Sequence, residues 1–260
     1  MGRKLLEIAY LGSNYCGWQV QPNGTTVQEI LQNALAQILK HRPDVTGCSR
    51  TDSGVHAKSF FCHFNTDVNI PNSGLVLGLN TVLPGDISAL SCYDVPDDFH
   101  ARYSSSGKMY CYKFLHSNIR DPFLEGRTLQ IKREINLSRA KEYCELLKGK
   151  HNFEAFSSIN RTVTDTVRTV YDCYIEKCEN HYCFYVKADG FLYNMVRIMV
   201  GTLLDYSSGK ISSLDITKAF ETGDRTLLGI TAPPQGLYLE KVFYNDFESL
   251  FEGSVNDFGR

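Results

Sequence analysis

Apolar residues in the first third of the chain follow two different periods. From 27 to 39 they recur at spacings of three and four residues, which places them on one face of a helix, and Thr26 with Glu29 fits a helix N-cap. Runs with strand character lie at 4–11, 45–49 and 58–65. A polar segment, 50–56, separates the last two runs, so the sequence predicts a loop held between two strands.

The remaining two thirds alternate irregularly between strands and helices. Further helices are predicted at 73–83, 136–147, 193–206 and 214–221, and strands at 87–95, 107–115, 163–177, 182–188 and 236–244. The turn 178–181 joins two of these strands into a predicted hairpin. Strands linked by short turns, with helices between them, favour an α+β fold with a mostly antiparallel or mixed β-sheet and flanking helices.

Two stretches of the chain share a loose pattern of strands around a long helix. They are 1–105 and 106–246, and a tail, 247–260, follows them. Because no linker rich in Pro, Ser or Gly separates the stretches, we expect two loosely repeated halves that pack as one body. The whole chain, 1–260, is then one functional unit.

Composition narrows the class of protein without naming a function. The chain has 27 Lys and Arg against 29 Asp and Glu, a formal net charge of −2, and 43% hydrophobic residues, which argues against disorder. The most apolar segment, 191–204, is shorter than the ~20 residues that a membrane helix needs, and it contains Arg197. No membrane is expected, and the start of the chain lacks a signal-peptide pattern, so we expect a cytoplasmic protein.

The nine cysteines form no C-x-x-C pair. Cys173, Cys178 and Cys183, with His181, are the one cluster that invites comparison with a zinc site, but zinc sites normally use more closely spaced pairs. We therefore expect reduced cysteines that pack as small apolar residues, and no metal.

The loop 50–56 combines an arginine, a carboxylate, two hydroxyls, a glycine and a histidine. One interpretation is purely structural: an Asx turn in which Asp52 accepts backbone N–H groups and Gly54 has positive φ. An aspartic protease fits poorly, because Arg50 would keep Asp52 ionised whereas the catalytic pair of that class shares a proton. A hydrolase using Ser53 and His56 also fits poorly, since the chain has no G-x-S-x-G motif.

A third functional interpretation comes from a family resemblance. Ser-Arg-Thr-Asp-Ser-Gly-Val-His-Ala at 49–57 resembles the G-R-T-D-A-G-V-H-A motif of the tRNA pseudouridine synthase A family. Other blocks that resemble the family, in the same order, lie at 15–19, 26–29, 83–87, 97–104, 108–112, 191–197 and 236–239. The chain departs from the family pattern at Ser49, Ser53 and Met109, where the family usually has glycine, alanine and a basic residue.

The resemblance implies an isomerase that converts uridine to pseudouridine at positions 38, 39 and 40 of the tRNA anticodon stem-loop. It implies no cofactor or metal, a homodimer, and the pseudouridine synthase fold. By the matched motifs, Asp52 is the catalytic aspartate, Arg197 its ion-pair partner, and Tyr110 the ring that stacks on uracil and could act as a base. Leu237 lines the uracil pocket and Arg50 contacts RNA.

These residue types suit the reaction on chemical grounds. Isomerisation breaks a glycosidic bond, and a fixed carboxylate either attacks the anomeric carbon or transfers a proton, as in glycosidases. Both routes stay open for Asp52, at C1′ or at the 2′ proton. A charged Arg197 on an apolar helix needs a partner, or else must reach the surface.

The segment 99–120 bears on RNA binding despite the negative net charge. It contains basic residues, including Arg102 and Lys108, interleaved with aromatic residues, and no acid. Such a mixture suits phosphate contacts and base stacking, or else a solvated strand face. The competing hypothesis is a non-catalytic RNA-binding or tRNA-folding protein on the same scaffold, which would be indicated by loss of Asp52, Tyr110 or Arg197; all three are present.

Overall fold

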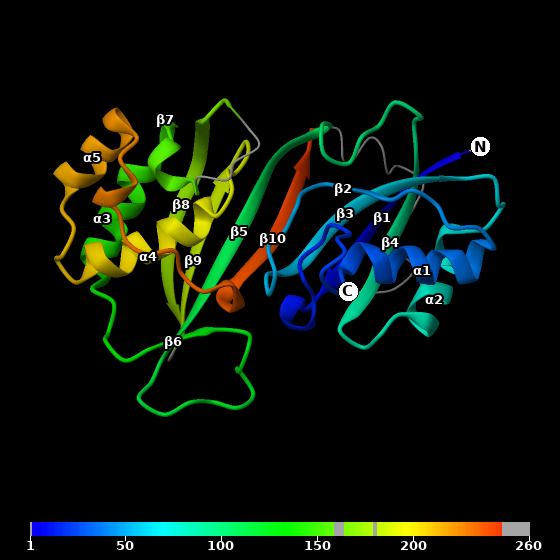
Figure 1. Ribbon diagram of the computed structural model, residues 1–260, viewed down its shortest axis with the longest axis horizontal. Coiled ribbons are helices and arrows are strands. Elements are labelled where there is room, and N and C mark those ends of the chain that lie inside the picture. The colour runs from blue at the N-terminus through cyan, green and yellow to red at the C-terminus, as the bar shows by residue number, and fades with distance from the viewer. Residues whose placement is uncertain (1, 159–163, 179–180, 246–260) are drawn as a thin grey trace. The chain divides into compact units, whose positions relative to one another are not determined.

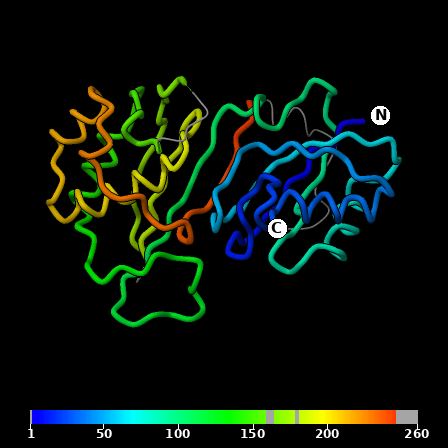
Figure 2. Tube along the Cα trace, in the orientation of Figure 1, coloured from blue at the N-terminus to red at the C-terminus, as the bar shows by residue number. Residues whose placement is uncertain are grey.

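A computed structural model describes residues 2–158, 164–178 and 181–245. The predicted turn at 178–181 and the start of the predicted strand at 163 fall partly outside these residues, and the tail 247–260 falls wholly outside them. The chain divides into two compact units: unit 1 comprises Met1–Ser106 and Leu239–Arg260, and unit 2 comprises Gly107–Tyr238. Figure 2 traces the path of the chain through them. Each unit is described by itself below.

Unit 1 is built on antiparallel strands. Its strand order is β4-β1-β3-β10, with β2 paired to β3. The strands are β1 (Gly2–Tyr10), β2 (Thr46–Gly47), β3 (His56–Thr66), β4 (Ile87–Val95) and β10 (Leu237–Tyr244). Only the part of β10 from Leu239 onward belongs to this unit. Figure 1 shows α1 (Val27–Leu39) and α2 (Asn72–Val82) next to each other beside these strands.

The sequence pattern explains the core of unit 1. In β1, Leu6 and Ile8 are fully buried, as are Leu31 and Leu35 on one face of α1. Thr26 is the N-cap of α1, and its hydroxyl accepts a hydrogen bond from Glu29 N at 3.4 Å, as predicted. The helical spacing of the apolar residues at 27–39 therefore predicted the buried face of α1 correctly.

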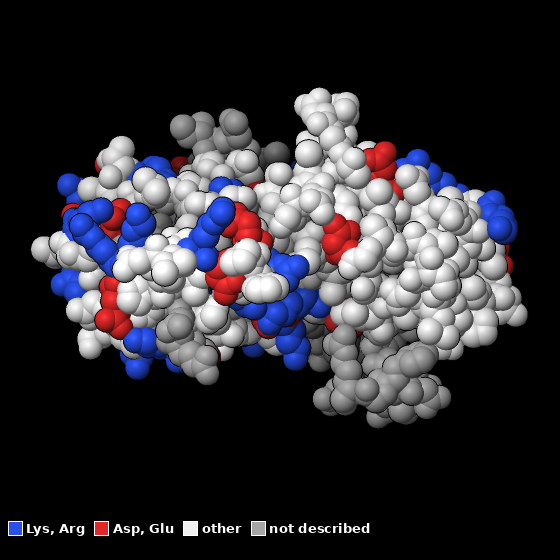
Figure 3. All heavy atoms as spheres, turned by 90° about the horizontal axis from the view of Figure 1, so that it is seen from below, with Lys and Arg blue, Asp and Glu red and all other residues white. Residues whose placement is uncertain are grey.

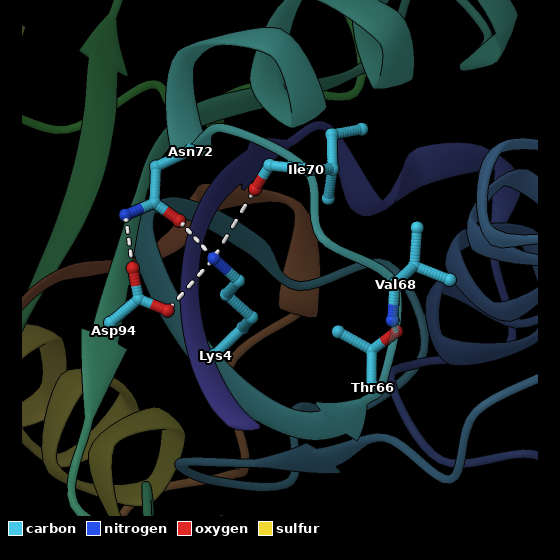
Figure 4. Close-up of polar contacts among 6 residues, drawn as sticks. All are labelled: Lys4, Thr66, Val68, Ile70, Asn72 and Asp94. Carbon is cyan, nitrogen blue, oxygen red and sulfur yellow. Dashed lines mark hydrogen bonds and ion pairs between the residues drawn. The ribbon is translucent and has the colours of Figure 1, made fainter. Parts of the chain in front are cut away.

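A polar cluster joins the edge of this core to the start of α2 (Figure 4). Lys4 of β1 is only 9% exposed at its side chain, and its ammonium lies 2.8 Å from Asp94 Oδ1 and 2.8 Å from Asn72 Oδ1. Asn72 Nδ2 donates to Asp94 Oδ2 at 2.9 Å. Burial raises the pKa of Asp94, but the hydrogen bonds from Lys4 and Asn72 lower it by more. The pKa of Asp94 is therefore below its ordinary value.

Unit 2 has the strand order β5-β9-β8-β7, with β6 paired in parallel to β5. The pairs β5–β9, β8–β9 and β7–β8 are antiparallel. The strands are β5 (Ser105–His116, of which Gly107 onward belongs to this unit), β6 (Leu129–Ile131), β7 (Gly149–Asn152), β8 (Val167–Cys178) and β9 (His181–Ala188). The helices are α3 (Leu137–Leu147), α4 (Met195–Ser207) and α5 (Ser213–Thr222).

Four short 3-10 helices complete the described elements of the two units. They are η1 (Gly12–Asn14) in unit 1, and η2 (Glu154–Phe156), η3 (Arg225–Leu227) and η4 (Pro234–Gly236) in unit 2.

Ten strands and five α-helices in the described residues confirm the predicted α+β class, with a mixed, mostly antiparallel sheet and flanking helices. The bounds of β4 coincide with the predicted 87–95. The short strands β6 and β7 were not predicted. No helix within the described ranges is long and apolar enough to cross a membrane.

Candidate active site

The loop that contains Asp52 is held in unit 1 by the backbone of an earlier segment. Trp18 N donates to Thr51 O at 3.2 Å, and Gly54 N donates to Tyr15 O at 3.4 Å. Ser53 Oγ donates to the same Tyr15 carbonyl at 3.2 Å. The predicted motif at 15–19 therefore supports the predicted motif at 49–57.

Two glycines allow these segments to approach closely. A Cβ on Gly12 would lie 2.0 Å from Val55 O, and one on Gly17 would lie 2.4 Å from Thr51 O. Gly17 also has a φ of 82°, in the left-handed region that favours glycine. No larger residue fits either position without moving the Asp52 loop.

The motif blocks at 83–87 and 26–29 hold the 15–19 segment in place. Tyr15 OH donates to Asp86 Oδ1 at 2.5 Å, and burial together with this carboxylate raises the pKa of Tyr15 well above its ordinary value. At the start of α1, Val27 N donates to Gly17 O at 3.2 Å. Four of the motif blocks from the sequence thus converge around one loop.

Asp52 itself is half-buried, in a turn closed by the hydrogen bond from Val55 N to Asp52 O at 3.1 Å. Gly54 has a φ of 79°, as predicted for this turn. His56 is fully buried, and its Nδ1 accepts a hydrogen bond from Gly12 N at 2.9 Å. His56 is therefore buried against the backbone of Gly12, and this burial adds to the case against a Ser53–His56 hydrolase.

In unit 2, Arg197 lies on α4 and is half-buried. Its Nε donates to Ala232 O at 2.7 Å, and its Nη1 donates to Asn194 Oδ1 at 2.7 Å. Asn194, the N-cap of α4, has a φ of 61° and donates in turn to Ser158 Oγ at 2.8 Å. Hydrogen bonds on two of its nitrogens therefore orient the guanidinium, and the contact with Asn194 was not predicted from the sequence.

The other two predicted pocket residues are buried in unit 2. Tyr110 of β5 is 6% exposed, and its ring meets that of Phe191 edge to face, with centroids 5.0 Å apart. Leu237, at the start of β10, is 5% exposed. Close by in sequence, Tyr112 OH donates to Pro233 O at 2.8 Å, and burial raises the pKa of this phenol, with Arg197 acting in the opposite direction.

The predicted RNA-contacting residues have different environments. Arg50 and Arg102 are exposed, whereas Lys108 is only 9% exposed. The aromatic residues interleaved with them were predicted to be available for stacking, and this is wrong for Tyr112 and Phe114, which are fully buried. These two rings lie on one face of β5 and form part of the core of unit 2. On the face drawn in Figure 3, Lys and Arg lie in several groups among Asp and Glu.

The described cysteines are free thiols, and most of them are buried, as predicted for reduced apolar residues. The side chain of Cys178 lies outside the described residues. Among the residues that the structure describes, no group of three or more His, Cys, Asp or Glu is placed to hold a metal ion.

Comparison with known proteins gives a consistent result. The family described as tRNA pseudouridine synthase matches residues 8–104 and 143–245. The tRNA pseudouridine synthase A 2 of Clostridium perfringens is 44% identical over 92% of this chain and 98% of its own length. The tRNA pseudouridine synthase A of Clostridium acetobutylicum has the same identity and coverage, and that of Thermoanaerobacter sp. is 43% identical over 94% of this chain and its whole length. The chain belongs to the tRNA pseudouridine synthase family.

Proposed function

We propose that this enzyme isomerises uridine to pseudouridine at positions 38, 39 and 40 of the tRNA anticodon stem-loop, in the cytoplasm, with Asp52 as its catalytic carboxylate. The observation that supports it most is the Asp52 loop, whose backbone is fixed by the 15–19 motif and by two glycines that tolerate no side chain. A loop braced in this way holds a carboxylate in one position, as covalent or acid–base catalysis requires.

The reaction needs one group that acts at the sugar and one that moves a proton. The C1′–N1 bond breaks, a C1′–C5 bond forms, the proton on C5 leaves, and N1 gains a proton, so the base is isomerised with no net loss of atoms. Asp52 either attacks C1′ and is later displaced, or removes and returns the 2′ proton. Neither route consumes a co-reactant.

Arg197 is proposed as the ion-pair partner that keeps Asp52 ionised, and Tyr110 and Leu237 as the walls of the uracil pocket. Within unit 2, hydrogen bonds to Ala232 O and Asn194 Oδ1 orient the Arg197 guanidinium, and the planar fork of N–H donors in a guanidinium matches the geometry of a carboxylate. Buried aromatic and aliphatic side chains such as Tyr110 and Leu237 are suited to a dry base pocket. Tyr110 is also proposed to help remove the C5 proton.

The exposed Arg50 and Arg102 are proposed as phosphate contacts. The buried Lys108 is a weaker candidate for this role. A homodimer is proposed from the family resemblance, and it would double the number of these cations around one tRNA.

The proposal is tested with tRNA transcripts labelled with tritium at C5 of uridine, since isomerisation must expel that hydrogen. Wild-type protein should release tritium to water, and Asp52→Asn should lose release by at least ~10⁴-fold, in the range seen when a nucleophilic residue is removed. Asp44→Asn, at an exposed aspartate, is the matched control and should retain activity. Transcripts without uridine at 38 to 40 should release none.

A different outcome would redirect the assignment. If wild-type protein binds tRNA but releases no tritium, the catalytic proposal is wrong for this substrate, and the non-catalytic RNA-binding hypothesis replaces it. If release continues after positions 38 to 40 are changed, the reaction stands and the proposed site on tRNA is wrong.

A further inference from the structure

A pocket of about 220 Å³ lies in unit 1 and includes Arg50, two residues before Asp52. Its wall also includes Gln28, at the start of α1, and Gln19, in the segment before that helix. Residues of the turn at 100–103 also belong to the wall. The described residues that line it include two arginines and no acid. The volume is below the roughly 300–1,000 Å³ of pockets that enclose a whole small ligand, so it suits one group of a larger molecule.

The rim of this pocket has an aromatic ring that faces solvent. Tyr103 is 75% exposed, which is unusual for a large aromatic residue in a turn between strands. Its ring lies against that of His100 in a tilted arrangement, with centroids 4.3 Å apart and planes 35° apart. The Arg102 guanidinium lies 5.7 Å from the same ring, within the distance of a cation–π contact.

This turn is ordered before any ligand arrives. His100 Nδ1 accepts hydrogen bonds from the backbone N–H groups of Arg102, at 3.1 Å, and Tyr103, at 3.3 Å. Ser104 N donates to His100 O at 2.9 Å, and Ser104 Oγ accepts from His100 N at 3.0 Å. A turn held by these four hydrogen bonds loses little further conformational entropy when a ligand stacks on its exposed ring.

The combination of groups matches one chemical class. An exposed ring that is backed by another ring provides a surface for a flat base, and nearby arginines pair with phosphate. Two residues of extended chain span at most ~7 Å, so a phosphate on Arg50 belongs to a nucleotide near the one presented to Asp52. Unpaired bases, rather than paired ones, offer a free face for stacking.

We propose that Tyr103 and His100 form a second base-binding subsite, separate from the uracil pocket, which stacks an unpaired nucleotide next to the reacting uridine while Arg50 and Arg102 hold its phosphate. The inference rests on the proposed function, because it takes tRNA as the substrate. The subsite fixes the strand so that the neighbouring uridine reaches Asp52.

The experiment places 2-aminopurine in the tRNA, in turn, on each side of the reacting uridine. Stacking quenches the fluorescence of this base, so binding of wild-type protein should quench it at one of the two positions. Tyr103→Ala should abolish the quenching and weaken tRNA binding by about 5- to 150-fold, the range for one stacked base. Tyr103→Phe, which keeps the ring, should preserve both.

Two further measurements separate stacking from a general loss of fold or charge. Removing the base at the quenched position should weaken binding to wild-type protein and leave binding to Tyr103→Ala unchanged, because both changes delete the same contact. Arg102→Gln should reduce the slope of log affinity against log salt by about 0.7, the value for one phosphate on a single strand. Tyr171→Ala removes another exposed tyrosine, 52% exposed on β8, and should alter none of these values.

The outcomes distinguish this inference from the proposed function. If wild-type protein releases tritium but quenches at neither position, or if Tyr103→Ala behaves like Tyr171→Ala, the subsite is wrong and the enzymatic assignment stands. If quenching depends on Tyr103 but no tritium is released, the subsite stands as an RNA-binding site and the proposed reaction fails.

Discussion

His63 makes the stability of unit 1 depend on pH. It is 8% exposed, and its Nδ1 accepts a hydrogen bond from Ala101 N at 3.1 Å, so it is held in the neutral form. The His100 ring lies 4.8 Å away, and the Arg3 guanidinium donates to Phe99 O nearby. Burial, then the charges of His100 and Arg3, lower the pKa of His63 from 6.5 to about 4.

The sign and size of the effect follow from linkage. Between pH 6.5 and about 4 the unfolded chain binds more protons at this position than the folded chain, so the free energy of unfolding falls as the pH falls through that interval. The stabilisation that unit 1 gains from keeping His63 neutral is fully present above pH 6.5. Each pH unit corresponds to about 1.4 kcal/mol, so the loss at pH 4 approaches roughly 3 kcal/mol.

The single tryptophan of the chain provides the assay. Trp18 lies in unit 1 and is 1% exposed, so its fluorescence during urea unfolding reports on this unit. His63→Asn keeps an oxygen that can accept the N–H of Ala101 but does not titrate. The wild-type free energy of unfolding should therefore fall more steeply than that of His63→Asn between pH 6.5 and 4.

Comparing slopes cancels the groups that titrate in both proteins. Carboxylates with lowered pKa values, such as Asp94, lose their contributions below their ordinary range near 3.8, at the acid end of this window. Parallel pH dependences for wild type and His63→Asn would refute the reasoning, because they would mean that His63 binds its proton equally well in both states.

Three other changes should have distinct effects. Gly12→Ala should reduce tritium release by at least 100-fold, because its Cβ would lie 2.0 Å from Val55 O and displace the Asp52 loop. Gly2→Ala, which has open space around it, should leave tritium release unchanged. Equal release by the two variants would contradict the proposed bracing of the loop. Tyr15→Phe should cost about 1–3 kcal/mol in urea unfolding, because Asp86 loses a hydrogen bond donated to a charged group; an unchanged midpoint would oppose this. Lys4→Met should change stability by less than ~1 kcal/mol, and Asp94→Ala should cost more, because only Asp94→Ala removes a partner from a buried ammonium. A larger loss of thermal stability in Lys4→Met than in Asp94→Ala would contradict this.

The sequence predicted the fold where periodicity was strong. The amphipathic helix α1 buries the face that its pattern indicated, and the strand β4 has the predicted bounds. The strand β7, with sequence Gly-Lys-His-Asn, has no apolar alternation, because it pairs along the edge of β8 and buries little. Its existence depends on a partner strand, which a local pattern does not reveal.

The candidate site was predictable through its motifs but not through its contacts. The position of Asp52 in a loop between strands followed from the polar segment between two apolar runs. The hydrogen bond between Tyr15 and Asp86 joins residues 71 positions apart, and no local spacing indicates it. The aromatic residues of β5 were misjudged in part because a mixture of basic and aromatic residues does not show which rings are open to solvent: Tyr112 is buried, and the ring of Tyr103, in the preceding turn, is exposed.

The return of β10 to unit 1 sets an order of events during synthesis. Unit 2 is contiguous, so all of its residues leave the ribosome before Leu239 does. Unit 1 needs residues on both sides of that insertion, including the ion pair of Lys58 with Glu240 and the hydrogen bond from Tyr244 OH to Ala101 O. The half that contains Asp52 is made first and finished last, so a ribosome that stalls before β10 leaves the Asp52 loop on an incomplete sheet.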